Sequence, residues 1–171
     1  RCVCANENRM SGIVKAKVMQ SKRTVALARW LLGKHLVRRM PDGAVVARLI
    51  TEVEAYHGES DLACHARAGR TRRTEPLYGP GGRWYVYLCY GIHQMFNIVT
   101  GGHGEGQAVL IRAVAPLVGL GDDPAVGRGP GKVTTALALD RRHDRRDLAR
   151  GALFVAAHAT PPRSEERRVG K

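Results

Sequence analysis

The first regular pattern of apolar and polar positions lies between Thr24 and Gly33. Four apolar residues fall on one face at helical spacing: Val25, Ala28, Leu31 and Leu32. A threonine before such a run and a glycine after it are typical of a capped helix. The pattern therefore predicts a helix that Thr24 caps and Gly33 ends.

The next apolar segments show strand-like spacing. Leu36–Arg38 and Ala44–Val53 flank the turn signal Pro41-Asp42-Gly43, which predicts a hairpin whose second strand ends at Glu54. Three later runs are also typical of strands: Trp84–Leu88, Met95–Val99 and Val109–Val114. Strands in the middle and a helix at each end predict a single α+β domain with one curved, largely antiparallel sheet and flanking helices.

The remaining segments are predicted to be loops or short helices. Ser60–Ala66 is predicted to form a short helix, and the glycine-rich, basic Arg67–Arg83 and the segment Pro116–Arg128 are predicted to be loops. A helical run follows Gly129-Pro130-Gly131-Lys132. Residues 1–20 have no clear period, so we expect a poorly ordered arm there and the folded domain at 21–162.

Length and composition are those of an ordinary globular protein, whereas the charge is unusual. The 171 residues fit one domain, and 44% of them are hydrophobic. No apolar run approaches the ~20 residues that cross a bilayer, and the N-terminus lacks the apolar centre of a secretory signal, so we expect an intracellular protein. The net charge of +13 favours a polyanionic partner, although a solvated basic surface accounts for it equally well.

The cysteines do not indicate a metal site. Cys2, Cys4, Cys64 and Cys89 form no C-x-x-C pair and show no zinc-type spacing with histidine. We expect free thiols and no bound metal.

Several polar residues are candidates for chemistry. Glu54, at the predicted end of a strand, is well placed at a cleft for general-base work, with Glu52 on the same face if the strand is regular. The alternative is a surface carboxylate. Asn97 and Arg112 lie inside apolar runs, where a buried polar group needs a partner, and Glu54 is a natural partner for Arg112.

Aromatic and basic residues gather around these candidates. Tyr56, Tyr85, Tyr87 and Tyr90 could stack a flipped base, but Tyr85 and Tyr87 alternate onto one strand face and could equally be core. Tyr90, before Gly91 in a predicted turn, is harder to explain as core. His65 could bind a ligand or fix a loop. Four arginines in the following loop suit phosphates or solvent: Arg67, Arg70, Arg72 and Arg73.

In its ordered series of motifs, the chain resembles the alkyladenine (3-methyladenine) DNA glycosylases of the mammalian type, found also in bacteria. The likeness runs from about Thr24 to Leu148 through E-V-E-A-Y, C-H-A-R-A-G-R-T-R-R-T, W-Y-V-Y-L-C-Y-G-I-H-Q-M-F-N-I-V, A-V-L-I-R-A, G-P-G-K and R-R-D-L. The resemblance implies excision of alkylated or deaminated purines from double-stranded DNA, which leaves an abasic site. It also implies no metal or organic cofactor, no membrane, and a monomer in the bacterial cytoplasm at the nucleoid.

The resemblance implies roles for the residues at the reacting bond. Glu54 matches the family's general base, and Arg112 matches an arginine close to the catalytic water. The residues that match those enclosing the flipped base are Tyr56, His65 and Tyr87. Asn97 matches the position that disfavours normal guanine.

The resemblance also implies contacts with the duplex. Tyr90 matches the residue that wedges into the DNA and fills the vacated space. Five basic residues are assigned to DNA binding with it: Arg67, Arg70, Arg72, Arg73 and Lys132. Thr74 departs from the family pattern, because many relatives have asparagine there.

The end of the chain departs further. Arg163–Lys171 reads R-S-E-E-R-R-V-G-K, which is typical of a translated sequencing adapter, so the family's final segment is predicted to be missing. The strand at Ala152–Ala159 is then predicted to lack a neighbour. Two alternatives remain open: an inactive DNA-binding protein on the same scaffold, and a basic RNA- or ribosome-associated module. The retained Glu54 argues against a pure binder.

Overall fold

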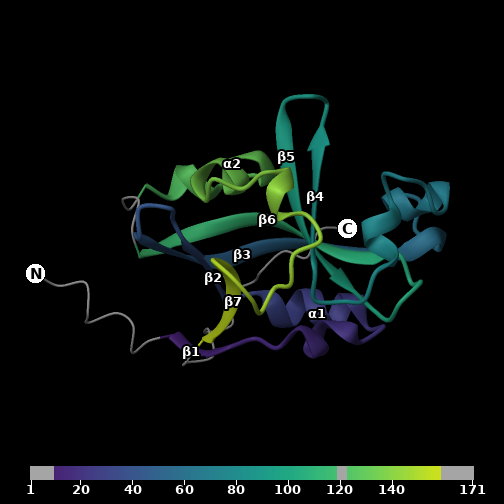
Figure 1. Cartoon of the computed structure of the whole chain (residues 1–171), viewed down its shortest axis with the longest axis horizontal. Helices are drawn as coiled ribbons and strands as arrows, with labels where there is room; N and C mark the ends of the chain where they lie inside the picture. The colour runs from purple at the N-terminus through teal and green to yellow at the C-terminus, as the bar shows by residue number, and fades with distance from the viewer. Residues whose placement is uncertain (1–9, 119–122, 159–171) are drawn as a thin grey trace, which may run out of the picture.

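The structure is a computed structural model that describes residues 10–118 and 123–158, and it is built on one curved antiparallel sheet (Figure 1). The seven strands lie in the order β1-β7-β2-β3-β6-β5-β4, and every neighbouring pair is antiparallel. The strands are β1 (Met10–Ile13), β2 (His35–Arg39), β3 (Val45–His57), β4 (Trp84–Cys89), β5 (His93–Thr100), β6 (Gln107–Val118) and β7 (Leu153–His158). The predicted α+β domain is confirmed.

Helices are short throughout the described residues. The α-helices are α1 (Thr24–Leu31) and α2 (Pro130–Ala136). Short 3-10 helices occupy the connections: η2 (Ala16–Gln20), η3 (Gly58–Ser60), η4 (His65–Ala68), η5 (Glu75–Tyr78), η6 (Pro124–Gly127) and η7 (Arg141–His143). The single short helix predicted for Ser60–Ala66 is therefore wrong, because η3 and η4 flank a turn there. The predicted loop at Pro116–Arg128 begins later than expected, since β6 continues to Val118.

The β2–β3 hairpin is confirmed, but its second strand is longer than predicted. The Asp42 carboxylate accepts a hydrogen bond from the backbone N–H of Ala44 (2.9 Å), and Gly43 takes a left-handed φ of +86°, which closes the turn. β3 then continues to His57, because its last residues still pair with β6. Glu54 therefore lies within a paired strand rather than at its end.

The helix α1 lies where it was predicted, but the prediction that Thr24 caps it is wrong. Thr24 is the first helical residue, and its buried hydroxyl donates to the Gln107 side chain (2.6 Å) and contacts the Thr100 hydroxyl (3.0 Å). Leu27 is buried, whereas Val25 is exposed. Gly33 follows the helix with a φ of +78°, as expected of a stop. Thr24 thus ties the helix to β5 and β6 instead of capping it.

Part of the segment predicted to be a poorly ordered arm forms two short elements, β1 and η2. β1 pairs with β7, and β7 pairs with β2 on its other side, so the strand predicted at Ala152–Ala159 does not lack a neighbour. After β1, η2 places the fully buried Met19 in the core. Residues 1–9 and the adapter-like 163–171 lie outside the described residues.

The sheet separates two buried clusters because side chains on β4 alternate in direction. Trp84 and Val86 face the main core, where the Trp84 ring lies 4.6 Å from that of Phe96. Tyr85 faces a smaller cluster with Cys64, Ala66, Leu77, Tyr78, Val99 and Ala108, against which Tyr56 and Tyr87 pack. This second face carries the candidate site.

Candidate active site

A carboxylate held by two donors forms the centre of the site. The Tyr56 hydroxyl donates to Oε2 of Glu54 (2.6 Å), and Nη1 of Arg112 donates to Oε1 (2.9 Å). Glu54 and Tyr56 come from β3, and Arg112 comes from the neighbouring β6. Each oxygen has its own donor, so the orientation of the carboxylate is fixed.

Arg112 bridges two carboxylates at the surface. Its Nε lies 3.7 Å from Oε2 of Glu52, and its side chain is 47% exposed. The predicted partnership with Glu54 is confirmed, whereas the predicted burial of Arg112 is wrong. The pairing of β3 with β6 shifts register on both sides of Glu52. These shifts leave Thr51 and Arg112 without a partner in the register, and the carboxylates of Glu52 and Glu54 both reach Arg112, as expected of residues on one face.

An aromatic pocket lies next to this carboxylate. Its lining includes Tyr56, which also binds Glu54, together with His65, Tyr87 and Asn97. The rings of His65 and Tyr87 are 4.4 Å apart between centroids. The pocket therefore brings together the four residues that the sequence assigned to base binding, from β3, η4, β4 and β5.

Tyr85 also lines the pocket, although sequence reasoning left it as a core candidate. It is 3% exposed, and its hydroxyl lies 3.2 Å from Nδ1 of His65. Its alternation with Tyr87 on β4 was the signal that could have placed both in one site. Tyr85 thus belongs to the buried cluster and also lines the pocket.

Burial sets the protonation of these groups. It lowers the pKa of His65, and the neighbouring Arg73 cation lowers it further, so the imidazole is neutral at pH 7. Burial, followed by the hydrogen bond to Glu54, raises the pKa of Tyr56. Burial is also the main cause that raises the pKa of Tyr87 to about 12. The pocket therefore presents uncharged rings beside one carboxylate.

Asn97 is a buried residue of the pocket lining. It is 3% exposed, and its amide Nδ2 donates to the backbone carbonyl of Tyr85 (3.2 Å) on the paired strand. This bond answers the sequence expectation that a buried amide needs a partner. It also fixes the direction in which the amide points.

Tyr90 stands at the tip of the β4–β5 hairpin, which projects beyond the rest of the molecule (Figure 1). The residue is 96% exposed. It has a φ of +50° and Gly91 a φ of +71°, and two left-handed residues in succession are typical of a tight hairpin turn. Tyr90 is therefore not a core residue, in agreement with the prediction.

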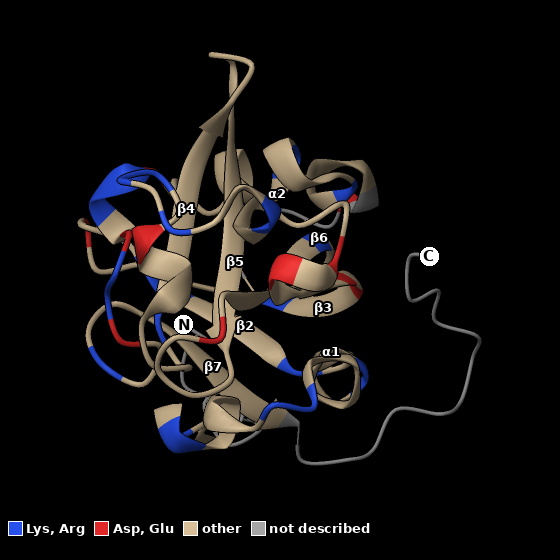
Figure 2. Cartoon of the chain, turned by 90° about the vertical axis from the view of Figure 1, so that its right-hand side faces the viewer, with Lys and Arg blue, Asp and Glu red and all other residues tan. Residues whose placement is uncertain are grey.

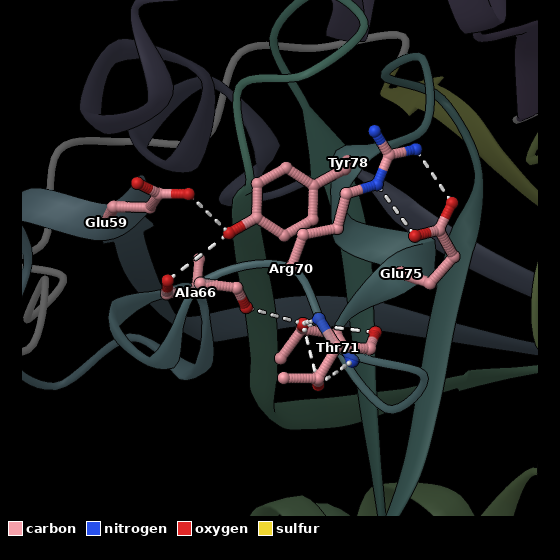
Figure 3. Close-up of polar contacts among 8 residues, drawn as sticks. Glu59, Ala66, Arg70, Thr71, Glu75 and Tyr78 are labelled. Carbon is pink, nitrogen blue, oxygen red and sulfur yellow. Dashed lines mark hydrogen bonds and ion pairs between the residues drawn. The ribbon is translucent and has the colours of Figure 1, made fainter.

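The arginine loop is held rigidly by two threonines. The Thr74 hydroxyl donates to the Gly69 carbonyl (2.8 Å) and accepts from the backbone N–H of Thr71 (2.8 Å). Figure 3 shows this network beside Tyr78, whose hydroxyl donates to Glu59 (2.7 Å). Thr74 thus organises the loop.

The predicted phosphate-binding residues differ in their surroundings. Arg70 donates twice to Glu75 (2.7 and 2.8 Å) and lies over the Tyr78 ring, so it already has a carboxylate partner (Figure 3). Arg73 lies over the Tyr87 ring, 5.6 Å from its centroid, at the edge of the pocket. Arg67 and Arg72 are exposed. Lys132, in α2, lines a separate hollow with His93, the first residue of β5 after the hairpin turn.

The described residues contain no group of three or more His, Cys, Asp or Glu arranged to hold a metal. Within the same ranges, Cys64 and Cys89 are free thiols. No helix in this part of the chain is long and apolar enough to cross a membrane.

Comparison with known proteins defines the class. The family model of methylpurine-DNA glycosylase matches residues 18–170. Relatives named "Putative 3-methyladenine DNA glycosylase" include one from Myxococcus xanthus (45% identity over 144 residues, 84% of this chain and 73% of the relative). Others come from Anaeromyxobacter sp. Fw109-5 (49% over 150 residues, 86% and 74%) and Legionella pneumophila strain Paris (41% over 138 residues, 81% and 73%).

The chain therefore belongs to the methylpurine-DNA glycosylase family, as its motifs predicted. It is a DNA-repair enzyme, a hydrolase of N-glycosyl bonds in DNA.

Proposed function

We propose that this glycosylase flips alkylated or deaminated purines out of double-stranded DNA into the aromatic pocket, hydrolyses the N-glycosidic bond and leaves an abasic site. One observation carries the proposal. The Glu54 carboxylate, fixed by Arg112 and Tyr56, adjoins a pocket of flat, uncharged side chains through the shared Tyr56. A base that stacks there has its sugar next to the carboxylate.

Glu54 is the general base in this proposal. A water molecule forms the new bond to the anomeric carbon, the base departs with the electrons of the broken C–N bond, and Glu54 accepts the proton of the water. The carboxylate also stabilises the positive charge that develops on the sugar. Arg112 holds the carboxylate in position, and its exposed guanidinium is close enough to contact the water.

Tyr56, His65 and Tyr87 enclose the base. Aromatic faces stack purines at a gain of about 1–3 kcal/mol per base, which helps to offset the few kcal/mol lost when a base leaves the duplex. A neutral His65 suits an uncharged ring at neutral pH, in line with its lowered pKa.

Asn97 is the specificity residue in this proposal, because its fixed amide would meet the exocyclic amine of guanine. Asn97→Ala is expected to raise excision of normal guanine about tenfold relative to hypoxanthine, since one steric or polar mismatch is worth ~1–3 kcal/mol. The ratio of the two single-turnover rates measures this. An unchanged ratio in a folded variant would remove Asn97 from the assignment.

Tyr90 is proposed to wedge into the duplex and hold the base extrahelical. Tyr90→Ala is expected to weaken binding to lesion DNA about tenfold or more, because a stacking contact of ~1–3 kcal/mol is lost. Its exposure of 96% means that its removal costs the fold little. Titration of a fluorescent lesion duplex gives the affinity. Equal affinities of variant and wild type would contradict the wedge.

The partner is double-stranded DNA with a damaged purine, and we propose that the enzyme acts as a monomer in the bacterial cytoplasm at the nucleoid. The test is base release from a duplex with one hypoxanthine or ethenoadenine, read as an alkali-labile abasic site. Release without strand cleavage before alkali is the expected result. A folded chain that binds the duplex and releases no base would instead support the inactive binder.

A further inference from the structure

A second hollow, of about 620 Å³, lies along the outer edge of β4. It shares Tyr85 and Tyr87 with the base pocket, so the two hollows adjoin at these residues. Three stretches of chain line it: Arg72, Arg73 and Pro76; Tyr85 to Leu88; and Arg141, Asp144 and Arg145. We call this hollow the β4 groove.

The third stretch is fixed to the sheet by its backbone. The N–H of Trp84 donates to the carbonyl of Arg146 (2.9 Å), and the N–H of Arg145 donates to the carbonyl of Trp84 (2.8 Å). The Asp144 carboxylate accepts from the N–H of Val86 (3.0 Å). These bonds satisfy the edge of β4 that no strand covers, and they hold this stretch at a defined position beside the strand.

The charge of the β4 groove is strongly positive. Four arginines line it against one carboxylate, that of Asp144. Asp144 lies 3.5 Å from Nε of Arg145, and the Arg145 side chain is still 56% exposed. Arg141 is also exposed. Figure 2 shows Lys and Arg positions gathered beside β4.

We propose that the β4 groove binds backbone phosphates of the DNA strand whose base enters the pocket, with Arg141 and Arg145 as contacts in addition to Arg72 and Arg73. This inference rests on the proposed function, since it takes damaged DNA as the ligand. Because the groove adjoins the base pocket at Tyr85 and Tyr87, the strand that carries a base into the pocket would lie close to the arginines of the groove.

The test uses the dependence of DNA binding on salt. Each neutralised phosphate contributes about 0.9 to the slope of log affinity against log salt concentration. Arg141→Gln/Arg145→Gln is expected to reduce this slope by about two on both damaged and undamaged duplexes, because phosphate contacts carry no sequence information.

Two variants control for charge and for shape. Arg29→Gln removes one positive charge, as Arg141→Gln does, but from α1, at the end of the molecule away from the hairpin (Figure 1), and is expected to leave the slope unchanged. Arg141→Lys/Arg145→Lys keeps the charge and is expected to restore most of the slope. If the double glutamine variant does not fold, Arg141→Gln alone, at an exposed site, is expected to reduce the slope by about one.

A slope equal to that of Arg29→Gln would overturn the inference. Failure of the proposed function gives a different result. In that case the wild type binds with its full slope but releases no base, and the effect of Arg141 and Arg145 on the slope remains measurable.

Discussion

Glu54→Gln is expected to reduce base release from a lesion duplex by about 10²–10⁴-fold, the range that general-base catalysis contributes. The amide has nearly the same shape but cannot accept the proton of the water, and it carries no charge to stabilise the sugar cation. Binding to the lesion is expected to stay within a few-fold of wild type, because the aromatic pocket is unchanged. Single-turnover release and a binding titration measure the two quantities separately.

Glu52→Gln is the matched control for this variant. It removes a carboxylate from the same strand and from the same arginine, at 3.7 Å instead of 2.9 Å, and Glu52 is exposed. Its base release is expected to remain within about threefold of wild type, because exposed ion pairs are worth only ~0–1 kcal/mol. Equal losses in both variants would mean that general loss of negative charge, and not proton transfer at Glu54, limits the reaction.

The second large effect concerns stability. Gly81→Ala is expected to lower the free energy of unfolding by about 1–3 kcal/mol, the usual cost of overpacking. A Cβ at Gly81 would overlap the backbone carbonyl of Met19 and lie 2.8 Å from the carbonyl oxygen of Gly101. Both neighbours are backbone, and the Met19 carbonyl also accepts the N–H of Gly101 (2.9 Å), so neither can move freely. Chemical denaturation measures the change.

Gly102→Ala is the control for this prediction. Its Cβ would meet only the end of the Glu105 side chain, at 4.0 Å, and its φ lies outside the left-handed region. The expected change is below about 0.5 kcal/mol, as for most surface substitutions. A small effect at Gly81 as well would mean that the segment of Met19 is not packed against the sheet as described.

The strands of the sheet could be predicted because their signals are local. Asp42 and Gly43 closed the β2–β3 turn as expected, and apolar runs located β4, β5 and β6. The pairing of β1 with β7 could not be predicted, because it joins Met10–Ile13 to residues more than 140 positions later. No pattern within a short segment indicates a contact between residues so far apart in the sequence.

Sequence patterns pointed to the residues of the candidate site, but they did not predict how these residues are arranged. The partnership of Arg112 with Glu54 was expected from charge, but the exposure of Arg112 was not, because alternation fails where β3 shifts register near Glu52. Thr24 resembled a cap by position, whereas its hydroxyl contacts Gln107, 83 residues away. Such polar contacts across the fold depend on tertiary packing and leave no mark in the local pattern.

The β4–β5 hairpin has a consequence for how lesions are located. Tyr87 is the fourth residue of β4 and lines the pocket, whereas Tyr90 follows the last residue of β4 and lies at the tip of the same hairpin. If Tyr87 and Tyr90 have the roles proposed above, the hairpin fixes the distance between the base pocket and the residue that enters the duplex. Tyr90 can then enter the duplex only to the depth at which the flipped nucleotide reaches the pocket. Hairpin length would then set which distortions of DNA the enzyme can inspect.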